Sequence, residues 1–316
     1  MNKRFFDLNT YFRNQFGERV HKIAIDAGLT CPNRDGTVGR GGCIYCNAKG
    51  SGTGKHNAGL SVTDQLEASK AAVIKRFKAH RFLAYFQSFT NTYAPLQRLK
   101  ALYDEALAVP GVVGLAIGTR PDCIDAQVLD LLQSYARDHL IWLEYGLQSA
   151  HDATLAHINR GHDVAAFQRA VAATAGRGIL IGTHIILGLP GENAGHMRAT
   201  AEFIARLPVD GVKLHLLYVI KGTPLEALHA AGDYQCLEQE VYADLVCDVI
   251  ERLPPDVVIQ RLTSDPHKHE LVAPQWALAK VRTLELIQKR LEERDTWQGK
   301  MTEAASHHLQ QGPAQK

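Results

Sequence analysis

Apolar segments of strand length alternate with helix-like segments along most of this sequence, and this alternation constrains the fold more than any other feature. Strand-then-helix repeats predict a parallel sheet whose strands are joined by crossover helices. Six units, rather than the eight of a complete barrel, predict an α/β fold with a partial (βα)6 TIM-like barrel. The expected strands are residues 21–26, 82–87, 112–118, 140–146, 179–187 and 211–219. The expected helices lie near residues 95–108, 125–137, 164–176, 195–206 and 235–252, and Ser61 or Thr63 is expected to cap a further helix.

The barrel is expected to span residues 21–255, with a shorter segment on either side. Aromatic and apolar residues at helical spacing predict an N-terminal helical extension over residues 1–20. Residues 256–296 form the expected C-terminal extension, in which residues 257–259 suggest one more strand. Residues 297–316 are polar and rich in glutamine and alanine, so we expect them to be a disordered tail.

Composition favours a soluble enzyme over a membrane protein. The chain has 316 residues, of which 46% are hydrophobic, and can bury one large core. No apolar run approaches the roughly 20 residues that cross a bilayer. No N-terminal apolar signal segment is evident, so we expect a cytoplasmic protein in a reducing compartment. The net charge of +2 is too small to indicate nucleic-acid binding by itself.

Three cysteines lie in one glycine-rich loop that follows the first expected strand. Cys43 and Cys46 form a C-x2-C pair, and Cys31 lies upstream in the same loop. Three thiolates on one loop indicate a metal site. Because no fourth cysteine follows at comparable spacing, an iron–sulfur cluster with one open iron is one interpretation. A zinc ion whose fourth ligand is His21 or His56 is the other.

Polar residues gather at the carboxyl ends of the expected strands, where barrels of this kind carry out their chemistry. In the fourth strand, Glu144, Gly146 and Gln148 share one face by strand alternation. A charged Glu144 inside a barrel is costly without a partner, so we expect a bound hydroxyl or amine beside it. Lys213 and His215 share one face of the sixth strand and are candidates for a substrate acid, base or phosphate contact. A solvated position at the rim is the alternative for Lys213.

Cys123 is the third candidate for a catalytic side chain, because it lies at the end of the third expected strand. A thiyl or nucleophilic role is one interpretation of this residue, and a buried, inert thiol is the other. Beside it, Arg120 and Asp122 are expected to form a local ion pair. The sequence therefore assigns no definite catalytic side chain.

Five segments of the chain are similar to those of a known family. They are CPNRDGTVGRGGCIYC, LAYFQSF, GTRPDC, INRGHD and LGLPGE, all within residues 16–275. The chain resembles the YhcC/YtqA family of uncharacterised bacterial radical SAM proteins, and its long first cysteine gap resembles the branch that contains the elongator catalytic subunit. The resemblance implies a [4Fe–4S] cluster on Cys31, Cys43 and Cys46, whose open iron binds S-adenosylmethionine (SAM) and cleaves it reductively to a 5′-deoxyadenosyl radical. It also implies an electron donor such as flavodoxin or ferredoxin.

The same resemblance implies where SAM would bind. Tyr45 would pack against the adenine, Gln148 would face the ribose, and Arg160 would bind the carboxylate through its planar guanidinium. The chain departs from related enzymes in two places. Its second strand ends without the Gly-Gly-Glu segment that receives the amino group of SAM, and Gly118 stands where elongator-type enzymes have a glutamate. The complete set of implied SAM contacts is Tyr45, Gln87, Ser88, Glu144, Gln148, Arg160, His184, Ile186, Leu217 and Tyr218.

The sequence leaves three hypotheses about the function open, and two of them differ in the substrate. The elongator-like segments suggest modified RNA, such as a wobble uridine of tRNA. The chain shows no evident appended RNA-binding or acetyltransferase module, so a small metabolite is the second hypothesis. A zinc-stabilised binding scaffold without catalytic activity, on a degenerate barrel, is the third.

Overall fold

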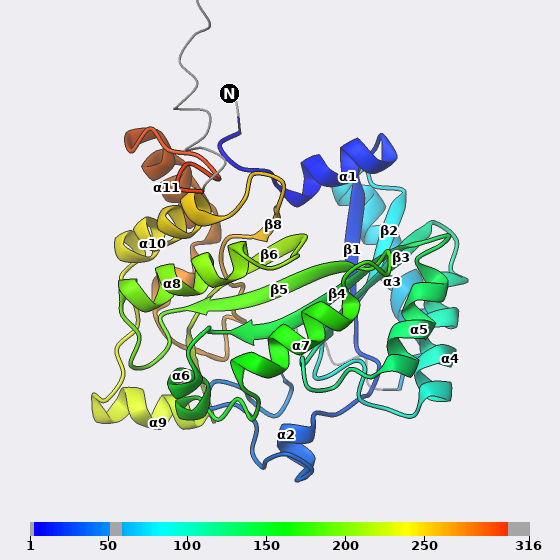
Figure 1. Cartoon of the computed structure of the whole chain (residues 1–316), viewed down its shortest axis with the longest axis horizontal. Coiled ribbons are helices and arrows are strands. Elements are labelled where there is room, and N and C mark those ends of the chain that lie inside the picture. The colour runs from blue at the N-terminus through cyan, green and yellow to red at the C-terminus, as the bar shows by residue number, and fades with distance from the viewer. Residues whose placement is uncertain (1–2, 51–58, 303–316) are drawn as a thin grey trace, which may run out of the picture.

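Seven parallel strands form one curled sheet in the computed structural model, which describes residues 3–50 and 59–302. The sheet is the half-barrel seen in Figure 1, with the strand order β1-β2-β3-β4-β5-β6-β8. This confirms the expected α/β partial barrel, with one strand more than the six units that the sequence suggests. The strands are β1 (Val20–Ile25), β2 (Arg81–Phe86), β3 (Val112–Thr119), β4 (Leu140–Gln148), β5 (Leu180–Leu187), β6 (Gly211–Leu216) and β8 (Val258–Arg261).

The seventh strand and a small second sheet follow the six expected units. β8 forms around the suggested segment 257–259 and pairs with β6. The expected strand 211–219 divides in two, because β6 ends at Leu216 and the chain leaves the barrel sheet. It continues as β7 (Val219–Ile220), which pairs antiparallel with β9 (Leu271–Ala273).

The crossover helices lie on the outer face of the sheet (Figure 1). Several begin at a polar residue whose side chain accepts a hydrogen bond from the first turn, which satisfies a free backbone donor. Ser61 does so for the nitrogen of Asp64 at 3.0 Å, as expected. Among the described residues, no helix combines the length and apolarity that crossing a membrane requires. The crossover helices are α3 (Val62–Phe77), α4 (Leu96–Leu107), α5 (Ala126–Tyr135), α7 (Val164–Thr174), α8 (Ala194–Ala205) and α10 (Gln239–Arg252).

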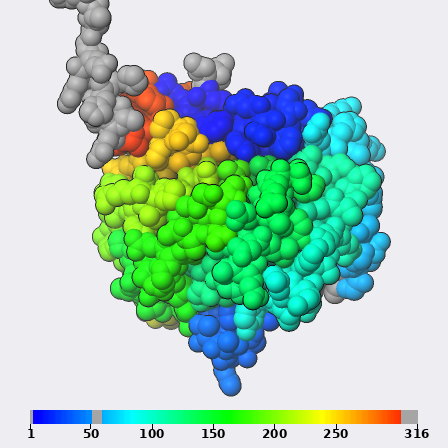
Figure 2. All heavy atoms as spheres, turned by 45° about the vertical axis from the view of Figure 1, so that its right-hand side comes forward, coloured from blue at the N-terminus to red at the C-terminus, as the bar shows by residue number. Residues whose placement is uncertain are grey.

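Shorter helices lie within the loops that follow the carboxyl ends of the strands. α2 (Pro32–Asp35) lies within the cysteine loop and projects at the bottom of the views in Figures 1 and 2. α6 (Asp152–His157) follows β4, and α9 (Pro224–Ala231) follows β7. At the C-terminal end, α11 (Lys280–Glu293) packs against α10 after a short 3-10 helix at Gln275–Leu278.

The N-terminal helix α1 (Leu8–Phe16) closes the amino-terminal end of the half-barrel. Its Phe12 is buried in a cluster with Leu83, Trp142 and Val258, which belong to β2, β4 and β8. The ring of Tyr11 meets that of Trp142 edge to face, with 5.7 Å between centroids. The cavity inside the barrel is therefore sealed at this end by apolar side chains.

The segment before α1 also covers the outer edge of the sheet. β8 is the last strand of the sheet, so one side of it has no neighbouring strand. The backbone nitrogen of Ile259 donates to the carbonyl of Phe6 at 2.8 Å, and Asp7 forms an isolated parallel bridge with Ile259. The N-terminal segment thus pairs with β8 at one point.

The first residues of the expected disordered tail are ordered. Gln298 is buried, and its side-chain nitrogen donates to the carbonyls of Pro254 at 2.6 Å and Val257 at 2.7 Å. Its side-chain oxygen accepts from the nitrogen of Phe6 at 2.9 Å. The boundary expected at residue 297 therefore falls inside an ordered segment that joins the two ends of the chain. Residues 303–316 lie outside the described residues.

Because Gly114 has no side chain, β3 can pack closely against β4 at this position. We therefore predict that Gly114→Ala strongly destabilises the fold. An added Cβ would lie 1.9 Å from the carbonyl oxygen of Leu140, a backbone atom that cannot rotate away. We expect a loss of unfolding free energy of about 1–3 kcal/mol or more, because the two strands must separate. Chemical denaturation measures this loss. Gly118→Ala is the matched control in the same strand, since its Cβ would lie 3.3 Å from the nearest atom, the carbonyl oxygen of Phe86. An equal loss in the two variants would contradict the prediction.

Candidate active site

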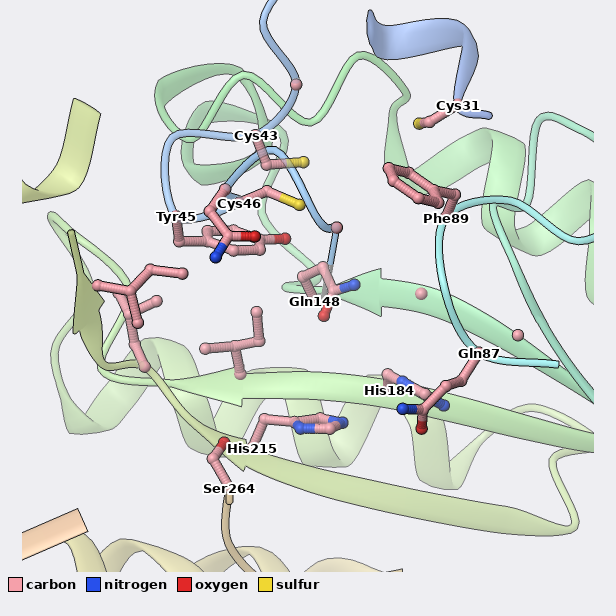
Figure 3. Close-up of a pocket in the computed structure, with 18 of the residues that line it drawn as sticks. Cys31, Cys43, Tyr45, Cys46, Gln87, Phe89, Gln148, His184, His215 and Ser264 are labelled. Carbon is pink, nitrogen blue, oxygen red and sulfur yellow. The ribbon is translucent and has the colours of Figure 1, made fainter. Parts of the chain in front are cut away.

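A cavity of about 430 Å³ opens at the carboxyl ends of the barrel strands. Its walls come from the cysteine loop, from the ends of β2 to β6, and from the segment that follows β8. Figure 3 shows side chains from these distant parts of the sequence around one space. The predicted site residues that line it are Cys31, Cys43, Tyr45, Cys46, Gln87, Glu144, Gln148, Arg160, His184, Ile186, His215, Leu217 and Tyr218.

Three predicted site residues do not line this cavity. Ser88 is buried, and its carbonyl accepts a hydrogen bond from the side chain of Asn91 at 3.1 Å. Lys213 is buried behind the cavity wall, where its amino group contacts Glu144. Cys123 is half-buried, and burial raises the pKa of its thiol to about 12, which makes a thiolate nucleophile unfavourable. Beside it, Arg120 and Asp122 form the expected ion pair, with a closest distance of 2.6 Å.

Hydrogen bonds to neighbouring loops hold the cysteine loop over the cavity. The side chain of Asn159 donates to the carbonyl of Gly42 at 2.7 Å. The guanidinium of Arg34 donates to the carbonyls of Cys46 and Asn47 at 3.1 and 2.5 Å. The side chain of Asn33 is buried and reaches across to the carbonyl of Asn159 at 2.6 Å. The loop is therefore anchored on both flanks of its C-x2-C pair.

The three cysteine sulfurs face the same space from two sides. Figure 3 shows the side chains of Cys43 and Cys46 near one another above the ring of Tyr45, with Cys31 across the cavity beside Phe89. Among residues 3–50 and 59–302, no three His, Cys, Asp or Glu side chains are close enough together to hold one metal ion. One zinc ion needs each sulfur at about 2.3 Å from the same atom, whereas a cluster lets each cysteine bind a different iron. The arrangement therefore fits a cluster better than a single ion.

The histidines suggested as a fourth zinc ligand do not support that alternative. The ring of His21 stacks on Phe77 of α3, with 4.3 Å between centroids, and it does not line the cavity. The interpretation of His21 as a ligand is therefore wrong, because its side chain packs against a crossover helix. His56 lies outside the described residues.

Arg160 and Gly146 form the polar wall next to Cys43. The guanidinium of Arg160 donates to the carbonyl of Gly146 at 2.7 Å, and its Nη1 lies 3.7 Å from the sulfur of Cys43. Burial opposes the charge of Arg160, but Cys43 and Tyr45 raise its pKa above the ordinary value. A Cβ on Gly146 would lie 2.6 Å from both Arg160 and Gln148. Only glycine fits here without displacing the two side chains assigned to SAM by resemblance.

Two residues that line the cavity have left-handed backbones although they are not glycine. Gln148 has φ of 76° and Phe89 has φ of 63°. Such conformations cost about 1–3 kcal/mol each and concentrate at functional sites. At Gln148 the pairing register between β4 and β5 also shifts, so the side chain leaves the regular alternation of the strand. Phe89 was not predicted, since no local pattern distinguishes it from a packed aromatic residue.

A polar cluster lies at the inner end of the cavity and includes part of its wall, and we call it the Glu144 cluster. Its centre is the fully buried carboxylate of Glu144, which accepts from Lys22 at 2.6 Å and from Lys213 at 2.6 Å. His184 contacts the same carboxylate at 3.0 Å. Lys213 also donates to the hydroxyl of Tyr85 at 2.9 Å. The members of the cluster are Lys22, Tyr85, Glu144, His184, Lys213 and Gln260, which accepts from Lys22 at 2.7 Å.

This cluster corrects two expectations. The partner of Glu144 was expected to be a bound hydroxyl or amine, but the protein itself supplies two ammonium groups and an imidazole. Lys213 is buried, so its alternative place at a solvated rim is wrong. Both expectations failed because strand alternation predicts which face a side chain occupies, but not which other strands reach the same point.

Sharing one carboxylate between two lysines sets the charges in the cluster. Burial alone would raise the pKa of Glu144, but Lys213 and Lys22 lower it well below its ordinary value. Burial lowers the pKa of Lys213 to about 7; Glu144 opposes this shift, and Lys22 and Arg261 add to it. Burial, with Lys213, also lowers the pKa of His184 to about 4. At neutral pH the cluster therefore holds an ionised carboxylate and a neutral imidazole, with the amino groups of both lysines against the carboxylate.

His215 and Arg261 extend this polar region into the cavity itself. The imidazole of His215 lies 5.1 Å from that of His184, centroid to centroid, and burial lowers its pKa well below the ordinary value. Its Nε2 atom is buried and has no hydrogen-bond partner among the described residues. Arg261 and Lys22 were missed as functional residues. Lys22 lies within β1 and Arg261 ends β8, each beside buried apolar residues, and that contrast is the signal that could have identified them.

The chain is similar to known proteins along most of its length. A model of the "Radical SAM superfamily" matches residues 33–204, and a model of the "Radical_SAM C-terminal domain" matches residues 209–293. Uncharacterized protein YtqA of Bacillus subtilis is 40% identical over 298 residues, which are 94% of this chain and 92% of YtqA. Protein YhcC of Escherichia coli is 41% identical over 263 residues, 83% of this chain and 84% of YhcC.

A solved structure shares the fold. The archaeal Elp3 of Methanocaldococcus infernus superposes with a TM-score of 0.65 at 17% identity. The match covers 88% of this chain and 64% of the archaeal chain. At this identity the match shows that the two proteins share the half-barrel fold, and it does not show a shared activity.

Proposed function

Because this chain belongs to the radical SAM superfamily, whose members are enzymes, we propose that it binds a [4Fe–4S] cluster and SAM and cleaves SAM reductively. The observation that carries the proposal is the convergence of Cys31, Cys43 and Cys46 on one cavity with no fourth cysteine in it. When bound, the cluster would supply the electron that converts SAM to methionine and a 5′-deoxyadenosyl radical.

The side chains around the cavity are suited to orient SAM. Arg160 is buried and carries its charge beside Cys43, where it can bind a carboxylate. The missing side chain of Gly146 lets the guanidinium of Arg160 and the amide of Gln148 lie close together at the cavity wall. Tyr45 packs against the apolar cluster of Ile186 and Leu217, which offers a flat surface for an adenine ring.

The closed amino-terminal end of the barrel would protect a reactive radical from water. The apolar side chains of α1 seal the barrel behind the Glu144 cluster, so within the described structure solvent reaches the cavity from the carboxyl ends of the strands. A reductant such as flavodoxin or ferredoxin would deliver its electron at the exposed side of the cysteine loop. This donor is part of the proposal.

Electron paramagnetic resonance on the anaerobically purified, dithionite-reduced protein tests the proposal. We expect the signal of a reduced [4Fe–4S] cluster that shifts on addition of SAM, with slow release of 5′-deoxyadenosine. A colourless, zinc-containing protein that stays silent after reconstitution with iron and sulfide would overturn the proposal in favour of the zinc-stabilised scaffold.

Two classes of substrate accompany the proposal. The hypothesis of a wobble uridine of tRNA is based on the elongator-like segments. The hypothesis of a small metabolite is based on the cavity of about 430 Å³. Nucleoside mass profiles of RNA from a deletion strain separate the two classes. A lost modified nucleoside supports RNA, and an unchanged profile removes it.

A further inference from the structure

Arg261 differs from the other charged residues that line the cavity. It projects from the end of β8 and has no hydrogen bond or ion pair within residues 3–50 and 59–302. The other three lining arginines are occupied: Arg120 by Asp122, and Arg34 and Arg160 by backbone carbonyls beside the cysteines. Arg261 is therefore an unpaired guanidinium that faces an enclosed space.

The carboxylates in the cavity wall cannot neutralise it, because each already has a cationic partner. Asp265 pairs with Lys280 at 2.8 Å, and Glu270 pairs with Lys49 at 2.5 Å. Glu144 is shared between two lysines. The wall thus offers no free negative charge among the described residues.

The surroundings of Arg261 carry an excess of positive charge. In the sheet register, Arg261 lies opposite Lys213 on β6. Lys22, Lys213 and Arg261 provide three basic groups, and Glu144 provides the one carboxylate among them. Arg261 is partly buried, and an uncompensated charge that is partly withdrawn from water is unfavourable, so such a group is normally paired. The missing partner is an anion.

His215 supplies a second recognition element at the same place. It lies two residues after Lys213 on β6, and its Nε2 is buried without a partner among the described residues. A neutral imidazole can donate one hydrogen bond from this atom. The Nε2–H group of His215 and the guanidinium of Arg261 could together donate hydrogen bonds to the oxygens of a planar or tetrahedral anion.

We propose that Arg261 and His215 form a subsite for an anionic group of the substrate, either a carboxylate or a phosphate. This inference rests on the proposed function, because it assigns the substrate class of the same cavity. The subsite is separate from the position assigned to the SAM carboxylate. That position is at Arg160, after β4 and beside Cys43, whereas Arg261 is on β8 at the last edge of the sheet.

The position of the subsite favours a small molecule over RNA. Arg261 pairs in register with Lys213, below the strand end, and is reached through a cavity of about 430 Å³. A cavity of this kind admits small molecules and not a folded polynucleotide. The phosphodiesters of a folded RNA, with nucleotides on both sides, would remain at the mouth.

Equilibrium dialysis of the full-length protein, purified anaerobically with its cluster, tests the subsite. The probes are a defined equimolar mixture of succinate, benzoate, glycerol phosphate and phenyl phosphate with their neutral amide or alcohol counterparts. We expect at least one anion to be retained about ten- to hundredfold more strongly than its neutral counterpart. If succinate or benzoate is retained, the subsite binds a carboxylate. If glycerol phosphate or phenyl phosphate is retained, it binds a phosphate.

Substitutions at Arg261 assign the retention to this residue. In Arg261→Met the preference for the anion should disappear, whereas Arg261→Lys should keep part of it, because the charge remains and the planar fork is lost. Arg169→Met is the matched control, since Arg169 lies on the outer helix α7 with 72% of its side chain exposed. It should retain the anion like the wild type. Thermal unfolding of each variant separates lost binding from lost folding, and Arg261→Lys keeps the test valid if Arg261→Met does not fold.

Four results would overturn the subsite. They are equal retention of neutral probes, no retention of any anion by the wild type, unchanged retention in Arg261→Met, and displacement of the anion by excess SAM. The last result would place Arg261 in the SAM site. The shift of the resonance signal by SAM is recorded on the same preparation, so failure of the subsite and failure of the proposed function are read separately.

Discussion

Replacing Cys43 with alanine is expected to remove the iron–sulfur cluster and to abolish formation of 5′-deoxyadenosine. Its sulfur faces the cavity and is contacted by Arg160 and by the side chain of Asn33, so it is held at a defined point of the wall. No fourth cysteine lines the cavity among the described residues, so no thiolate can take the place of the lost ligand. Iron and acid-labile sulfide per protein measure the loss directly, independently of activity.

Two control variants make this result specific. Cys236→Ala changes a cysteine outside the cavity and should bind iron like the wild type. Cys123→Ala should also keep the cluster, because its thiol lies beyond the cavity wall beside Asp122. Wild-type iron content in Cys43→Ala, or equal losses in all three variants, would contradict the assignment of the loop as the cluster site.

Replacing Glu144 with glutamine is expected to destabilise the fold by about 3–5 kcal/mol, because the amino groups of Lys22 and Lys213 lose the carboxylate that they share. Glutamine keeps the shape of the side chain, so packing changes little. Chemical denaturation of preparations with equal iron content measures the difference. The exposed control Glu293→Gln, which removes a surface partner of Arg290, should unfold like the wild type.

A second variant and the pH dependence test the electrostatic origin of this loss. Adding Lys213→Met to Glu144→Gln removes one of the two amino groups left without the carboxylate and should recover part of the stability. The folded-state pKa of Glu144 is lowered, so its contribution is present above its ordinary pKa of 4.5 and is lost as pH falls through the lowered value. The penalty should therefore be complete at pH 7 and shrink below about pH 4.5. A penalty that is independent of pH, with no recovery in the double variant, would indicate a packing defect.

The fold and the position of the cysteine loop could be predicted from the sequence because their signals are local. Strand and helix periods are set by neighbouring residues, and Cys31, Cys43 and Cys46 lie within one loop. Alternation along β4 also placed Glu144 and Gly146 on the inner face correctly.

The partners of the inner residues could not be predicted, because they depend on how the sheet curls. Lys22 on β1 and Lys213 on β6 reach Glu144 from strands that are not its neighbours in the sheet. Arg261 becomes a wall residue only because β8 adds to β6 and extends the half-barrel by one strand. The burial of Gln298 likewise depends on contacts with Phe6 at the other end of the chain.

The contact between the N-terminal segment and β8 has a consequence for how copies of this protein meet one another. An open half-barrel has two terminal strands, and an uncovered strand presents backbone groups that can pair with a strand of another molecule. The backbone nitrogen of Ile259 is already bonded to Phe6, and Gln298 fastens Phe6 in place. The extensions at both ends of the chain thus discourage intermolecular sheet growth, which a barrel that never closes would otherwise invite.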